Sequence, residues 1–170
     1  LRRAERDAER LALAAPVERV RVLRPSLVVG HSATHAATST TGFYRLVGNV
    51  RACRPPCLAG GPDARLDCLP VDLVAREAVA VARSTSTEQV FHLTSAAPAP
   101  TLAEAVATIA ARTGVEAPAI PGADRGRAPV RFDRAHTDAA LGIPGGRFPL
   151  DGEALGPYVD WYLRHAEAEP

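Results

Sequence analysis

The stretch VRVLRPSLVVG, residues 20–30, indicates the fold class of this chain. Its β-branched and aliphatic residues surround Arg24 and Pro25, a pattern typical of a buried strand that ends at a functional loop. The segment before it, from Arg2 to Ala15, is rich in alanine, leucine, arginine and glutamate, all good helix formers, and Pro16 ends it. A helix that leads into a buried strand predicts an α/β protein.

The downstream sequence repeats this alternation of strands and helices. We expect strands at residues 66–71 and 89–94, separated by a helix over 73–83 that Asp72 caps. The other expected elements are an exposed loop over 31–41, a helix over 43–50, a short extended segment over 130–133, a helix ending at Leu141, and a last helix starting near Pro157.

The clearest local signal lies after the second of these strands. Thr101 and Glu104 have the Thr-x-x-Glu spacing of a capping box, in which each residue satisfies a free backbone amide of the other. Gly114 follows the apolar periodicity, where a glycine commonly ends a helix. The sequence therefore predicts a helix from Thr101 through Thr113.

The composition is that of an ordinary globular protein of one domain. The 170 residues are 46% hydrophobic and 23% charged, with a mean hydropathy of -0.04 and a formal net charge of +1. So small a charge creates no field that would gather nucleic acid or anionic lipid, so we expect neither nucleic acid nor a membrane as a partner. The longest apolar runs are about five residues, against roughly 18 for a bilayer-spanning helix. Three cysteines and the lack of a secretory signal predict a cytoplasmic location.

Three segments, taken in order, resemble the second half of an extended short-chain dehydrogenase/reductase. They are residues 20–30, the segment LPVDLVA at 69–75, and the segment VFHLT at 90–94 with the capped helix behind it. Among these enzymes, the thioester reductases that end nonribosomal peptide and polyketide assembly lines are the most similar branch of the NAD(P)-dependent epimerase/dehydratase superfamily. The resemblance covers nearly the whole chain, although the tail from Val130 onward matches only loosely.

The resemblance implies an α/β fold of two parts. Residues 1–30 would end the Rossmann-like domain with its catalytic helix and the following strand. Residues 31–170 would form a small, mostly helical substrate-side subdomain that returns one or two strands to the sheet. The whole is thus expected to be the carboxyl-terminal part of a Rossmann-type parallel sheet plus a substrate-binding subdomain.

In this family, catalysis depends on a Tyr-x-x-x-Lys pair, whose spacing places both side chains on one helix face. The resemblance aligns Ala8-Glu9 with the family's Ala-Glu, which places Leu1 at the tyrosine position and Glu5 at the lysine position. Neither side chain fits the role, and no other register supplies a lysine, because all 20 residues counted as Lys+Arg are arginines. Two interpretations stay open: a truncated or damaged start, or a degenerate member without activity. No catalytic residue is assigned.

NAD or NADP is the cofactor that the resemblance implies for an intact parent enzyme. The chain has no Gly-x-x-Gly-x-x-Gly or Gly-x-Gly-x-x-Gly motif between a strand and a helix, and hence no phosphate-binding turn. We therefore expect this chain alone to bind no dinucleotide. The resemblance assigns Pro25, Ser26 and Val28 to the nicotinamide end; the alternative is a buried strand that ends in a turn.

His31, Ser32 and Arg65 are the candidate substrate-binding residues. His31 and Ser32 would line the mouth of a substrate site, or simply belong to a polar surface loop. Related nucleotide-sugar enzymes hold a substrate phosphate with an arginine at the place of Arg65, a task that suits the guanidinium fork; the alternative is a solvated surface arginine. The three cysteines lack a fourth ligand at regular spacing, so no metal site is predicted.

The parent reaction implied by the resemblance is hydride transfer from a nicotinamide cofactor to an acyl thioester or a carbonyl. The partners would be a small-molecule or carrier-protein-bound acyl substrate, and a missing amino-terminal half or a partner chain. Two alternatives remain. One is half of a nucleotide-sugar epimerase or dehydratase, and the other is a non-catalytic binding module whose exposed sheet edge pairs with another chain.

Overall fold

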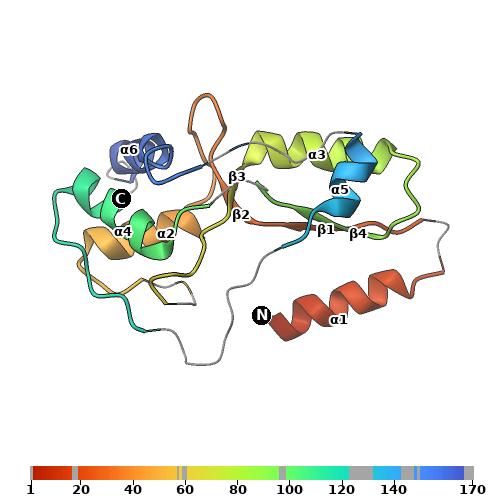
Figure 1. The fold of residues 1–170 in the computed structure, drawn as a ribbon, viewed down its shortest axis with the longest axis horizontal. Coiled ribbons are helices and arrows are strands. Elements are labelled where there is room, and N and C mark those ends of the chain that lie inside the picture. The colour runs from red at the N-terminus through yellow and green to blue at the C-terminus, as the bar shows by residue number, and fades with distance from the viewer. Residues whose placement is uncertain are drawn as a thin grey trace.

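A computed structural model describes residues 2–16, 19–56, 58, 61–95, 99–122, 132–142, 148 and 150–166 (Figure 1). The elements follow one another as helices and strands that alternate through most of the chain. In order they are α1 (Arg2–Leu13), β1 (Val22–Pro25), β2 (Leu27–Val29), α2 (Phe43–Arg51), β3 (Cys68–Pro70), α3 (Val71–Arg83), β4 (Val90–Leu93), α4 (Leu102–Thr113), α5 (Ala135–Leu141) and α6 (Gly156–His165).

The strands form two parallel pairs, β1 with β4 and β2 with β3. β1 and β2 follow each other directly, and the hydrogen-bonding partner changes between them. The Ser26 amide donates to the Leu93 carbonyl at 2.9 Å, whereas the next amide, that of Leu27, donates to the Asp67 carbonyl at 3.1 Å. Parallel strands connected through helices confirm the α/β, Rossmann-type fold class expected from the sequence.

Buried side chains gather in two cores that differ in size. The larger core packs α2, α4 and α6 against β2 and β3, and we call these helices the helical unit. The smaller core lies between β4, α3 and α5, and we call β1, β4, α3 and α5 the strand unit. Figure 1 shows the two units at opposite ends of the molecule, with α1 on the side of β1 and β4 away from α3. The fully buried members of the smaller core are Leu69, Val81, Phe91 and Leu93.

α5 covers the edge of β4 that does not face β1. The carbonyl of His92 accepts a hydrogen bond from the Thr137 hydroxyl at 2.9 Å, and that of Val90 lies 3.3 Å from His136 Nδ1. The carbonyl of Thr94, two residues further along, accepts from the guanidinium of Arg134. Successive outward carbonyls of β4 are therefore satisfied by side chains, which prevents this edge from pairing with another strand.

Arg134 also joins three elements from a buried position. Only 5% of the residue is exposed, and its Nη2 lies 3.0 Å from Glu77 Oε1 on α3. Its Nε donates to Asp138 on α5 at 2.6 Å. Among the described residues, Glu77 Oε2 and the Thr94 hydroxyl are buried beside this network without a hydrogen-bond partner. The strand unit therefore depends on buried charge as well as on apolar packing.

Most expected elements are present, and the start of α3 corrects one of them. Asp72 was expected to cap this helix, but the cap position is Pro70, which makes no side-chain cap hydrogen bond, and Asp72 lies in the first turn. α4 has the predicted capping box between Thr101 and Glu104, and Gly114 ends it in the left-handed conformation. Of the extended segment expected at 130–133, the first two residues lie outside the described part of the chain.

α1 is the least buried of the described helices. Its residues are almost all exposed, including Leu11 at 68%, although the helix is amphipathic. It is joined to β1 by an ion pair between Glu9 and Arg24, in which Arg24 Nε donates to Glu9 Oε2 at 3.1 Å. The apolar stripe of α1 thus lacks, within the described residues, the cover that such a stripe normally receives.

Candidate functional site

The candidate site lies where β2 and β3 end, because the carboxyl ends of parallel strands share one edge of a sheet. β2 continues into the loop of residues 31–41, and β3 continues directly into α3. Ligands of open α/β sheets bind in the crevice outside these carboxyl ends. Asp72, in the first turn of α3, accepts two hydrogen bonds from the loop: Oδ1 from the Ser32 amide at 2.8 Å, and Oδ2 from the Ser32 hydroxyl at 2.7 Å.

The first part of this loop folds back on itself. The His31 amide donates to the Ala36 carbonyl at 2.9 Å, and the His35 amide donates to the His31 carbonyl at 2.8 Å. His31 Nδ1 in turn accepts from the Ala33 amide at 3.0 Å. Gly30 lies beneath this turn so closely that a β-carbon there would collide with the carbonyl of His35. The glycine that ends the quoted stretch is therefore required by a close backbone approach.

Two buried tyrosines lie under the loop. The Tyr44 hydroxyl, on α2, accepts from the Gly30 amide at 2.9 Å. Tyr158, on α6, is 1% exposed and meets the ring of His35 edge-on, with 4.8 Å between ring centroids. Its hydroxyl has no hydrogen-bond partner among the described residues. Burial, and then the nearby Tyr44, Asp72 and Cys68, raise the pKa of Tyr158, so this hydroxyl keeps its proton.

The residues assigned to a nicotinamide end lie along the junction of β1 and β2. Pro25 ends β1 and is exposed, whereas Val28, in β2, is partly buried. The Ser26 hydroxyl is buried and has no hydrogen-bond partner among the described residues. An unsatisfied hydroxyl at this junction is compatible with a carboxamide partner, because buried polar groups normally find one. The assignment of these three residues to a nicotinamide end stays a prediction.

Arg65 lies away from the Ser32–Asp72 pair. It forms an isolated bridge with Thr101, and its Nη1 donates to the Ala99 carbonyl at 2.7 Å. Its charge also helps to lower the pKa of Glu104, after the larger effect of the Thr101 hydrogen bonds. The structure therefore brings His31 and Ser32 together with Asp72, and places Arg65 at the start of α4.

The positions aligned with the catalytic pair lie on or before α1. Glu5 is an exposed residue of that helix, and Leu1 lies outside the described residues. Of the cysteines, Cys53 is exposed and Cys68 is buried, both as free thiols, and Cys57 is outside the described part. Within the described ranges, no group of three or more His, Cys, Asp or Glu side chains is arranged to hold a metal ion.

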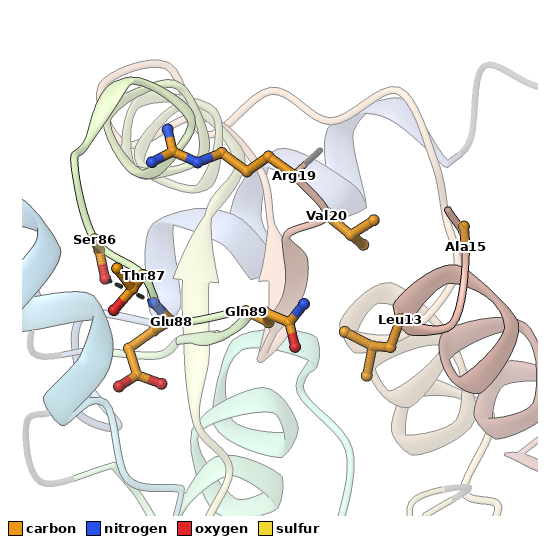
Figure 2. Close-up of a pocket in the computed structure, with 8 residues that line it drawn as sticks. All are labelled: Leu13, Ala15, Arg19, Val20, Ser86, Thr87, Glu88 and Gln89. Carbon is orange, nitrogen blue, oxygen red and sulfur yellow. Dashed lines mark hydrogen bonds between the residues drawn. The ribbon is translucent and has the colours of Figure 1, made fainter. Parts of the chain in front are cut away.

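An open hollow of about 240 Å³ lies at the opposite ends of the strands. It is lined by the end of α1 and by the segments that lead into β1 and β4, and Figure 2 shows Leu13, Val20 and Gln89 facing it. These are the amino ends of parallel strands, whereas ligands of α/β sheets bind at the carboxyl ends. The hollow therefore does not coincide with the candidate site.

The sequence did not identify two of the residues that shape this site. Asp72 was expected to cap a helix, and Tyr158 was not among the candidate residues. No local signal marks the role of Asp72, because its partner Ser32 lies 40 positions away in the sequence. No local pattern marks Tyr158, since its role depends on a loop more than a hundred positions away in the sequence.

Comparison with known proteins gives one family model and many solved structures. Residues 6–78 match the model NAD_binding_4, described as male sterility protein. The structure of MoeE5 in complex with UDP-glucuronic acid and NAD is 25% identical, with a TM-score of 0.65 over 92% of this chain and 53% of that one. The terminal R domain of the myxalamid PKS-NRPS pathway is 24% identical, with a TM-score of 0.65 over 88% and 45%.

A third structure shows the same fold at lower identity. UDP-glucuronic acid 4-epimerase from Bacillus cereus, in complex with NAD, is 16% identical, with a TM-score of 0.58 over 84% of this chain and 44% of that one. The chain therefore spans about half the length of the solved structures that it matches. No curated protein matches it significantly. None of the described helices is long and apolar enough to cross a membrane.

Proposed function

We propose that the chain corresponds to the carboxyl-terminal half of an extended short-chain dehydrogenase/reductase and forms the substrate side of an NAD(P)-dependent, thioester-reductase-like oxidoreductase. The parent reaction is hydride transfer to the carbonyl carbon of a carrier-bound acyl thioester or of another carbonyl compound. The bound nicotinamide supplies the hydride. The protein side of this reaction consists of binding and orientation by residues of the loop and of the β1–β2 junction.

The observation that carries the proposal is the extent of the family match. It runs from α1 to α3 and so includes the β1–β2 junction, the loop of residues 31–41 and Asp72. Pro25, Ser26 and Val28 would line the nicotinamide end, and His31 and Ser32 would face the substrate. We assign no catalytic acid or base to this chain, because it has no lysine for the family's pair.

In the proposed enzyme, the binding site for the cofactor phosphates and the catalytic pair belong to sequence other than these residues. The alternative is that the chain is a non-catalytic member of the family. We favour a cofactor-binding half, provided by the same polypeptide or by a partner chain. That half would pair with the edge of β1 away from β4 and cover the apolar stripe of α1. Among the described residues, this edge of β1 pairs with no strand and α1 is an exposed amphipathic helix, and both are surfaces that such a half would bury.

A nucleotide-sugar substrate is the second candidate, and the similarity to MoeE5 favours it. It would require Arg65 to bind a phosphate. The bonds of Arg65 to the start of α4, and the nearby carboxylate of Glu104, weaken this assignment. A third candidate, a non-catalytic interaction module located in the cytoplasm, would use the same uncovered α1 and β1 surface without a substrate.

The test is to complement the chain with the cofactor-binding half of a related thioester reductase. We expect no saturable NADPH binding by the chain alone, and NADPH binding by the complemented pair. The pair should then oxidise NADPH with an acyl-pantetheine thioester, and it should not epimerise UDP-glucuronic acid in the presence of NAD. Tight NADPH binding by the 170-residue chain alone would contradict the proposal. Turnover of the nucleotide sugar, abolished by Arg65→Ala and unaffected by Arg45→Ala at an exposed position, would establish the second candidate instead.

A further inference from the structure

The loop of residues 31–41 makes its two shortest polar contacts with another element through a single carboxylate. Both oxygens of Asp72 accept hydrogen bonds from Ser32, one from the amide and one from the hydroxyl, at 2.8 and 2.7 Å. The residues are 40 positions apart in the chain. Hydrogen bonds to a charged acceptor are shorter and stronger than those between neutral groups, so this is the firmest polar attachment that the loop has in the described structure.

We infer that Asp72 is a positioning residue, which holds the loop of residues 31–41 over the carboxyl ends of β2 and β3 through its two hydrogen bonds with Ser32. That the loop faces a substrate rests on the proposed function. The contact between Asp72 and Ser32 does not depend on it. It gives Asp72 a role that is separate from starting α3. The helix begins after Pro70, and the carboxylate of Asp72 is directed to the loop.

The charge state of Asp72 agrees with this role. Partial burial by itself would raise the pKa of this carboxyl. The hydroxyl and the amide of Ser32, the amide of Asp72 itself and the charge of His31 outweigh that effect and lower the pKa below its usual value. The carboxylate is therefore ionised wherever the protein is folded near neutral pH, and it accepts both hydrogen bonds as a charged group.

The position of the loop determines what the site exposes. Gly30, just before the loop, is bound to the hydroxyl of Tyr44, and the ring of His35 covers Tyr158. The Tyr158 hydroxyl is buried and unpartnered among the described residues. Release of Ser32 would let His31 and Ser32 leave the sheet edge and would bring this hydroxyl within reach of water or a ligand. The hydrogen bonds of Asp72 therefore hold His31 and Ser32 towards the substrate and keep the Tyr158 hydroxyl covered.

Amide hydrogen exchange of the full 170-residue chain tests the inference. In Asp72→Ala, we expect the loop amides of His31, Ser32 and His35 to exchange roughly tenfold faster or more, because a charged acceptor is lost. Ser32→Ala keeps the hydrogen bond from the backbone amide of residue 32 to Asp72, so it should show a smaller increase in the exchange rate. Ser32→Thr keeps both donors and should restore the slow exchange of the wild type. Ser39→Ala, in the same loop, is the matched control, since its hydroxyl contacts Thr41 within the loop.

The reference amides are those of β2 and β3, which flank the site. A residue that only stabilised the fold would accelerate exchange in these strands by the same factor as in the loop. Equal acceleration in Asp72→Ala, or no acceleration in its loop, would overturn the inference, and so would fast exchange in Ser32→Thr. The measurement uses no ligand. Failure of thioester reduction by the complemented enzyme would therefore remove the proposed function without altering this result.

Discussion

The helical unit and the strand unit differ in the kinds of side chain that they bury. The helical unit buries a large set of aromatic and aliphatic side chains from α2, α4 and α6, and its aromatic rings contact one another, as Tyr44 does with Trp161 and Tyr162. Among the described residues, the smaller core has four buried hydrophobic residues, of which Leu69 comes from β3, and the strand unit adds the buried Arg134 and Glu77. The two units therefore differ in what stabilises them: apolar and aromatic packing in the helical unit, and a smaller apolar core with a buried ion pair in the strand unit.

The largest effect is expected in the strand unit, from Arg134→Met. Removal of the guanidinium leaves Glu77 buried without its cation, which should lower the free energy of unfolding by about 3–5 kcal/mol. Urea unfolding measures this loss, with Arg164→Met at an exposed position as the control. Because the penalty comes from the unpaired carboxylate, the double variant Glu77→Met with Arg134→Met should recover much of it. A loss below about 1 kcal/mol in the single variant would mean that the network does not hold the strand unit together.

The next effect tests the core of the helical unit through Ile109→Ala. Ile109 is fully buried between α4 and its neighbours, and truncation of such a side chain costs about 2–5 kcal/mol through lost burial and the cavity left behind. Val79→Ala, at a residue of the strand unit that is 50% exposed, should change stability by about 0.5 kcal/mol or less. Equal losses in the two variants would show that the burial of Ile109 adds nothing to stability.

A smaller effect is expected at the boundary between the units, from Gly30→Ala. The added methyl group collides with the carbonyl of His35, so the turn of the loop must shift, at a cost of about 1–3 kcal/mol. Gly122→Ala is the matched control, because a β-carbon there meets no atom within 4 Å. Thermal unfolding of both variants gives the comparison. Equal midpoints would show that the loop has room to move away from Gly30 without loss.

The smallest effect is expected at the start of α4, from Thr101→Ala. It removes the hydroxyl that accepts from the Glu104 amide at 3.1 Å, and should cost about 1 kcal/mol. Thr101→Ser, which retains the hydroxyl, should behave as the wild type. A full loss in the serine variant would show that the methyl group and not the cap carries the effect.

The same capping box predicts a pH dependence. The amide and the hydroxyl of Thr101 lower the pKa of Glu104 below its usual 4.5. A carboxyl with a lowered folded pKa contributes stability above its unfolded pKa, and this contribution is lost as the pH falls through the folded value. Unfolding at neutral and at acidic pH should therefore show a smaller acid-induced loss in Glu104→Gln than in the wild type. An unchanged pH profile in that variant would exclude the linkage.

Local chemistry made much of the fold predictable. The capping box of Thr101 and Glu104, the terminating glycines Gly114 and Gly142, and the runs of residues 20–30 each act over a few positions, and the corresponding elements are present. The candidate site was predictable only in part. His31 and Ser32 do lie at the carboxyl edge of the strands, but Arg65 is bound to the start of α4 instead of lying beside them.

The sequence by itself thus determined the order of helices and strands, the ends of α4, and a resemblance that the comparisons support. Only the tertiary structure decided that Asp72 accepts hydrogen bonds from Ser32, that Arg134 forms a buried ion pair with Glu77, and that Tyr158 is buried under the loop. The physical reason is distance along the chain. The first two pairs are 40 and 57 positions apart, and no local propensity encodes a contact that exists only after the elements have packed.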